Sequence, residues 1–113
     1  MSLPASMRTI EITSPGEPSV LQPGTRPVPQ PGAGEVLIKV AATGMCRADI
    51  MQRRGNYPVP PGASDILGLE VSGTVAALGA GVKDWRVGDE LCALVQGGGY
   101  AQYCTAPAPQ CLP

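Results

Sequence analysis

The side chains best suited to chemistry gather around a short glycine-rich segment, residues 66–73, which reads ILGLEVSG. Glu70 is the one acid in this apolar stretch, so we expect its carboxylate to be buried. Upstream, Cys46, Arg47 and Asp49 supply a thiol, a cation and a second acid. The chain contains no histidine, so an imidazole is neither its general base nor its metal ligand.

The elements that must position these residues are short strands separated by many turns. The chain has 15 Gly and 13 Pro against three Tyr, one Trp and no Phe, which is typical of β-structure and not of a helical bundle. A short helix is predicted over residues 46–54, ending at Gly55. Apolar patterns predict strands near residues 8–12, 35–42, 71–77, 90–95 and 100–106, with Val82 adding strand surface.

The remaining segments predict connections. Residues 14–34 contain six prolines, so we expect them to form a surface connection or a sheet edge. Residues 56–62 predict a loop, and the glycines of residues 96–99 predict a flexible one. The glycine spacing in residues 66–73 predicts a strand that turns tightly and passes close to another backbone.

The overall composition excludes several classes of protein. With 113 residues, the chain predicts one domain over residues 1–113. A net charge of -1 and 43% hydrophobic residues exclude a disordered tail and a nucleic-acid or anionic-lipid binder. No apolar run approaches the ~20 residues of a membrane span. Four cysteines without a CxxC motif favour a reducing, cytoplasmic setting over a disulfide framework.

Several separated motifs resemble one enzyme superfamily. The segment ILGLEVSG, followed by Gly79, Gly81 and Val82, is similar to the signature of the medium-chain dehydrogenases/reductases. Residues 46–57, residues 60–65 and the segment GGGYAQY at residues 97–103 closely resemble NADPH:quinone oxidoreductases of the p53-inducible subgroup. The resemblance extends over the chain from Met7 onward.

This resemblance implies a mainly β fold, a GroES-like, partly open β-barrel with one short helix. It also implies that the chain is the N-terminal catalytic domain of a two-domain reductase. In that family a following Rossmann domain holds most of the NADPH. Neither residues 79–81 nor residues 97–99 precede a helix in a βαβ unit, so we expect that domain to be missing and the isolated chain to be inactive.

The resemblance also predicts an enzyme without zinc. Zinc-type members carry histidine at the position of Leu69 and a Cys-His pair where Cys46-Arg47 stands. Zinc needs about four N, S or O ligands, and leucine supplies none. The other three cysteines do not have the spacing of the structural zinc lobe. We therefore expect no metal site.

Cys46 departs from the quinone reductase pattern, which usually has asparagine contacting the nicotinamide side of the cofactor. By resemblance, Cys46 and Arg47 are the expected cofactor-binding residues. Three interpretations of the thiol stay open: a lone thiol at the cleft, a buried core cysteine, or a reactive thiol activated by the helix start and Arg47.

By resemblance, Tyr57 is the expected catalytic-site residue, lining the quinone cleft and donating a hydrogen bond to the substrate carbonyl. The alternative is a loop tyrosine that packs against the proline-rich segment. Asp49 and Glu70 could pair with each other, or with Arg47 or Arg53, and the favoured role is a hydrogen-bonded charge that holds helix to strand.

The expected function is hydride transfer from NADPH to a quinone. The alternatives are an enoyl or alkenal reductase acting on an α,β-unsaturated carbonyl, or a non-catalytic GroES-fold binding module. A domain without its Rossmann partner should expose an apolar patch near Ile50 and residues 97–103, which could favour a homodimer. We expect no nucleic-acid or membrane partner.

Overall fold

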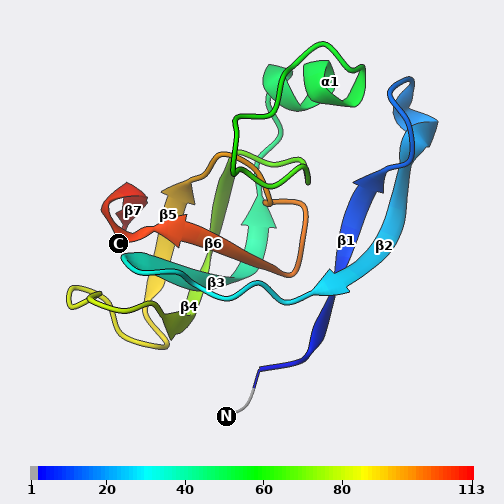
Figure 1. Ribbon diagram of the computed structural model, residues 1–113. Helices are drawn as coiled ribbons and strands as arrows, with labels where there is room; N and C mark the ends of the chain where they lie inside the picture. Colours follow the sequence, from blue (N-terminus) through cyan, green and yellow to red (C-terminus); the bar gives the residue numbers. More distant parts are fainter. Residues whose placement is uncertain (1–2) are drawn as a thin grey trace.

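The computed structural model describes residues 3–113 and consists of two antiparallel sheets and one short α-helix (Figure 1). The elements are β1 (Ser6–Ile12), η1 (Pro18–Val20), β2 (Leu21–Pro27), β3 (Glu35–Thr43), α1 (Arg47–Arg53), β4 (Glu70–Leu78), β5 (Glu90–Leu94), β6 (Tyr103–Pro107), η2 (Ala108–Gln110) and β7 (Cys111–Leu112).

A five-stranded sheet with the order β6-β3-β4-β5-β7 forms the body of the domain. Alternate residues of β3, β4 and β5 point into one core, as the period of a half-buried strand requires. Two register shifts between β3 and β4 bend this sheet. The buried residues of this core cluster are Val36, Ile38, Val71, Val75, Leu91, Ala93, Ala106 and Cys111. Other buried hydrophobic residues are Met7, Leu37, Ile66, Leu67 and Cys104.

The proline-rich segment contains a strand that was predicted only as a connection or an edge. β2 pairs with β1 along its whole length in a separate two-stranded ribbon, which stands beside the main sheet in Figure 1. Pro23 and Pro27 fit there because, within residues 3–113, β2 pairs with β1 alone, so an edge strand can do without the N–H groups that proline lacks. The prediction of a sheet edge is therefore confirmed for residues 21–27, and the alternative prediction of a surface connection is wrong for them.

The ribbon joins the main sheet through β1. The Ile10 N–H donates to the Tyr100 carbonyl at 2.9 Å, and the Gln102 N–H donates to the Arg8 carbonyl at 3.2 Å. The two sheets thus form a curved, partly open half-barrel, as the resemblance implied. The Arg26 guanidinium on β2 binds Glu11 at 2.5 Å and Asp65 at 2.7 Å, which ties the ribbon to the loop before β4.

The predicted helix is confirmed: α1 begins after Cys46 and is followed by Gly55, whose φ of 85° permits the turn that ends it. Two strand predictions were too long at one end, since Val82 lies outside β4 and β6 begins only at Tyr103. The two-residue strand β7 was not predicted.

The loop of residues 96–99 is not the flexible loop that its glycines predicted. Gly98 and Gly99 are buried, and their N–H groups donate to the carbonyls of Ile66 and Gly68 at 2.8 and 3.1 Å. The loop is therefore held against residues 66–68 by backbone hydrogen bonds and forms part of the interior. Within residues 3–113, no helix is long and apolar enough to span a membrane.

Candidate functional site

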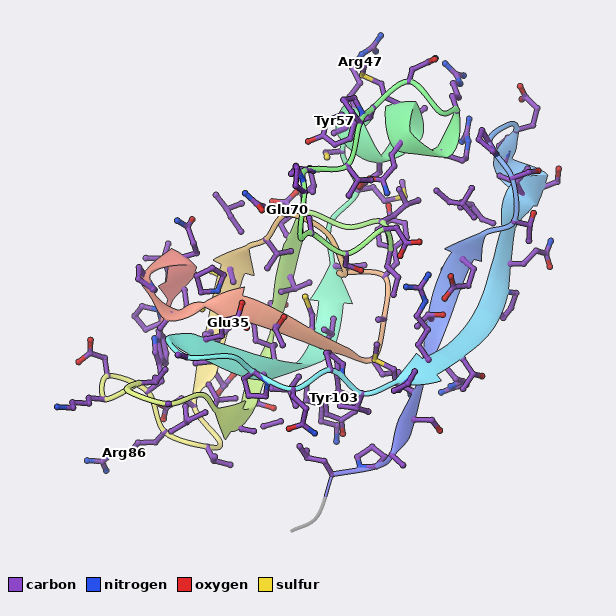
Figure 2. The ribbon with its side chains drawn as sticks, viewed as in Figure 1. Glu35, Arg47, Tyr57, Glu70, Arg86 and Tyr103 are labelled. Carbon is purple, nitrogen blue, oxygen red and sulfur yellow. The ribbon has the colours of Figure 1, made fainter. Side chains whose placement is uncertain are left out.

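The start of α1 presents the two expected cofactor-binding residues. Cys46 is the N-cap, with extended backbone at φ −138°, and its side chain is half-buried. Arg47 is the first helical residue and is exposed. Figure 2 shows the Arg47 side chain at the outer side of α1, pointing away from the two sheets. The half-buried position of Cys46 is consistent with a thiol at a cleft and contradicts a fully buried core cysteine.

Tyr57 lies two residues beyond Gly55, at the start of the loop that returns from α1 to β4. It is half-buried, and in Figure 2 it lies between Arg47 and Glu70 on one side of the molecule. The N–H of the preceding residue, Asn56, donates to the Met51 carbonyl at 2.8 Å, which keeps Tyr57 close to α1. Tyr57 does not line the apolar hollow described below, where Glu70 lies.

Asp49 is the buried acid of this region, with 4% of its surface exposed. Its Oδ2 accepts hydrogen bonds from the Cys46 N–H and the Tyr100 hydroxyl, each at 3.1 Å. Its Oδ1 accepts from the Gly68 N–H at 3.2 Å. Asp49 is thus a hydrogen-bonded charge, as expected, but it attaches the helix to Gly68 and Tyr100, which lie outside the strands.

The partners expected for Asp49 were wrong. Its carboxylate binds two backbone N–H groups and a phenol instead of Glu70, Arg47 or Arg53. Arg53 is buried elsewhere, where its Nε donates to the Gly16 carbonyl at 3.0 Å. Arg53 lies about one helical turn after Asp49, but its side chain binds Gly16 in the β1–β2 connection, whereas Asp49 faces Gly68 and Tyr100.

Tyr100 is a weaker acid than a solvent-exposed tyrosine. Burial raises the pKa of Tyr100 to about 12, and the nearby Asp49 charge adds to the increase. The phenol therefore stays protonated at neutral pH and serves as a hydrogen-bond donor to Asp49. Tyr100 was not predicted as a site residue, although its position directly after three glycines was a signal that its backbone lies close to another segment.

Glu70 is exposed, so the prediction of a buried carboxylate was wrong. It is the first residue of β4, and its side chain extends over Gly44, where a Cβ atom would lie 2.6 Å from its Oε1. Its backbone does connect the site: the Glu70 carbonyl accepts from the Gly44 N–H at 3.1 Å and from the Thr43 hydroxyl at 3.0 Å.

A hollow of about 690 Å³ lies beside Glu70, above the ends of β3, β4, β5 and β7. Leu94 and Leu112 line it, and they are 62% and 64% exposed. The predicted apolar patch was therefore misplaced in part. Ile50 is indeed 43% exposed, but Gly98 and Gly99 are buried, and the largest exposed apolar side chains of this hollow belong to β5 and β7.

The donor set does not fit a zinc ion. Within residues 3–113 there is no group of three or more Cys, Asp or Glu side chains that could hold a metal. Leu69 stands beside Glu70 where a nitrogen ligand would be needed, and Asp49 is engaged by three hydrogen-bond donors. Cys92, Cys104 and Cys111 are free thiols, and burial raises the pKa of Cys104 to about 12.

Proteins of known sequence resemble this chain over most of its length. A protein from Rhizobium meliloti (strain 1021) named alcohol dehydrogenase is 46% identical over 76 residues, covering 67% of this chain and 22% of that protein. A probable quinone oxidoreductase of Schizosaccharomyces pombe is 37% identical over 99 residues, covering 87% of this chain and 30% of that protein.

Among solved structures, a native mycobacterial structure complexed with NADPH superposes with a TM-score of 0.83 at 42% identity. The match covers 95% of this chain and 34% of that one. The chain thus spans between about a fifth and a third of the length of these three relatives. The sequence profile of the alcohol dehydrogenase GroES-like domain matches residues 32–113. The chain therefore belongs to the alcohol dehydrogenase GroES-like domain family, within the medium-chain dehydrogenases/reductases.

Proposed function

We propose that this chain is the catalytic-domain part of a zinc-independent NADPH:quinone oxidoreductase. The observation that carries the proposal is the 42% identity to a structure complexed with NADPH, together with a site whose donors do not fit zinc. A relative named quinone oxidoreductase supports the choice of acceptor. NADPH, when bound, supplies the hydride that reduces the acceptor, and the protein supplies position and electrostatics.

The residues of the α1 region have complementary tasks in this proposal. The exposed Arg47 guanidinium offers a charge for a cofactor phosphate, and Cys46 contacts the nicotinamide side. Tyr57 donates a hydrogen bond to a carbonyl of the quinone and holds it for reduction. No side chain need be an obligatory acid, because a reduced quinone oxygen can take its proton from water.

The exposed leucines suggest where the rest of the enzyme packs. Leu94 and Leu112 form a pair of large apolar side chains beside the 690 Å³ hollow. The relatives are roughly three times as long as this chain, which leaves room for a dinucleotide-binding domain. We assign the hollow to the contact with that domain, and we expect the isolated chain to bind NADPH weakly and to have no turnover.

The proposal is tested by following NADPH consumption with a panel of quinones and enals. The enzyme should be the longer protein that joins this chain to its dinucleotide-binding domain. Quinone-dependent oxidation of NADPH that survives a metal chelator supports the proposal. If enals are reduced faster than quinones, the proposed acceptor is wrong and an α,β-unsaturated carbonyl takes its place. The proposed cofactor and the proposed zinc independence would not be affected.

A second candidate is the interconversion of an alcohol and a carbonyl compound. The observation that favours it is the 46% identity to a protein named alcohol dehydrogenase. The same assay distinguishes the two, because this candidate requires NADP⁺ reduction with simple alcohols and no preference for quinones.

A further inference from the structure

We propose that Asp49 is the positioning residue of this site, holding the helix start that carries Cys46 and Arg47 in a fixed place relative to the motif segment, residues 66–73. The identity of what Cys46 and Arg47 contact rests on the proposed function. The positioning itself rests on three hydrogen bonds that one buried carboxylate makes to three separate parts of the chain.

The three partners are distant in sequence but adjacent in space. Gly68 lies 19 residues from Asp49, and Tyr100 lies 51 residues from it. Gly68 and Tyr100 are themselves joined through their neighbours, because the Tyr100 N–H donates to the Leu67 carbonyl at 2.8 Å. Residues 66–68 and 98–100 are therefore held together by backbone hydrogen bonds. Asp49 is the side chain that attaches the helix start to this pair of segments.

The carboxylate is bound without a counter-ion. Over residues 3–113 the ion pairs join Arg26 to Glu11 and to Asp65, and none involves Asp49. A buried carboxylate is costly unless donors compensate for its lost hydration, and here three donors do so. A hydrogen bond to a charged acceptor is directional, which makes such a carboxylate a precise attachment point.

Other contacts hold the opposite end of α1. The Arg53 side chain donates to the Gly16 carbonyl at 3.0 Å, and the Gly16 N–H donates to the Arg53 carbonyl at 2.9 Å. The Gln52 amide donates to the Asp65 carbonyl at 2.9 Å. Loss of the Asp49 contacts should therefore free the first turn of α1 and leave its last turn attached.

The variant Asp49→Asn tests this arrangement with almost no change in volume. The substitution replaces one carboxylate oxygen with an amide nitrogen, which donates and does not accept. If this nitrogen faces the Gly68 N–H, two donors oppose each other. The alternative flip places that nitrogen against the Cys46 N–H. Either orientation breaks at least one of the two backbone attachments. Tyr100→Phe removes only the third donor, and Tyr103→Phe is its matched control on β6.

Residue-resolved amide hydrogen exchange on the 113-residue chain gives the primary readout. We expect Asp49→Asn to accelerate exchange at Cys46 or Gly68 by about tenfold or more, the equivalent of one charge-assisted hydrogen bond, while β3 and β4 keep their protection. The exposed control Asp84→Asn should change none of these rates. Unchanged exchange in Asp49→Asn, or equal acceleration throughout the chain, would overturn the proposal.

Kinetics of the longer enzyme give the second readout. A misplaced helix start should raise KM for NADPH about tenfold and change kcat by less, because the cofactor contacts act in the ground state and the transition state alike. Local acceleration of exchange with an unchanged KM would overturn the positioning role and leave Asp49 as a purely structural residue. A wild-type enzyme that does not oxidise NADPH would overturn the proposed function instead, and the exchange result would then decide the role of Asp49.

Discussion

Gly68 and Gly99 pack backbone against backbone, so closely that a Cβ atom on Gly68 would lie 2.6 Å from the Cα of Gly99. The contact joins the motif segment to the buried loop of residues 97–99. Both the fold and the site depend on it, since Asp49 attaches the helix start to the same place through Gly68.

Substitution Gly68→Ala should destabilise the domain strongly. Gly88→Ala is the matched control, because the two glycines have similar φ values of 106° and 97° but nothing lies within 4 Å of a Cβ on Gly88. Both variants lose about 1–3 kcal/mol from backbone strain. Gly68→Ala should lose a further ~1–3 kcal/mol from overpacking, measured by urea denaturation. Equal losses in the two variants would contradict the close contact.

The Arg26 ion pairs should make stability depend on acidic pH. The Arg26 guanidinium holds the pKa of Glu11 below its usual value, and it does the same for Asp65. Both folded-state pKa values are lowered, so this contribution is present above about pH 4.5 and is lost as the pH falls through the folded pKa values. Thermal unfolding between pH 3 and 7 should show a steeper acid loss in the wild type than in Arg26→Gln. Parallel profiles would refute the coupling.

Tyr100 should produce the opposite dependence at alkaline pH. Its folded pKa of about 12 lies above the usual value of 10, so the folded state retains a proton that the unfolded state has lost. Its contribution is full below pH 10 and falls as the pH rises toward 12. Denaturant titrations across this range should show a smaller alkaline loss in Tyr100→Phe than in Tyr103→Phe. The same loss in both variants would show that Tyr100 is not the responsible group.

The sequence was most informative where structure is local. The alternating apolar residues of 35–42 and Gly55 after the helix predicted β3 and the end of α1, because each depends on neighbouring residues alone. The motif glycines also predicted the close backbone approach correctly. β2 was predicted only as a connection or a sheet edge because of its prolines. β7 was missed because its two residues form a strand only when β5 is beside them.

The site was predictable in some of its residues but not in its connections. Asp49 was expected to be a hydrogen-bonded charge, yet its partners are two backbone N–H groups and a tyrosine 51 positions away. No pattern within the helix specifies them. Glu70 was expected to be buried because it follows apolar residues, but the first residue of a strand can still extend its side chain into solvent.

Tyr57→Phe should slow quinone reduction only partly in the longer enzyme. One hydrogen bond to a substrate carbonyl contributes about 0.5–1.5 kcal/mol, which corresponds to a decrease of about 2–10-fold in kcat/KM. Tyr103→Phe should leave the rate unchanged. A complete loss of activity in Tyr57→Phe would show that the phenol is an obligatory acid, contrary to the mechanism proposed here.

The most direct measurement is the rate of NADPH oxidation by the longer enzyme with a quinone acceptor, before and after removal of metals by a chelator. We expect quinone-dependent oxidation of NADPH at the same rate in both samples. Activity that appears only with zinc, or that converts alcohols with NADP⁺ and leaves quinones unreduced, would contradict it.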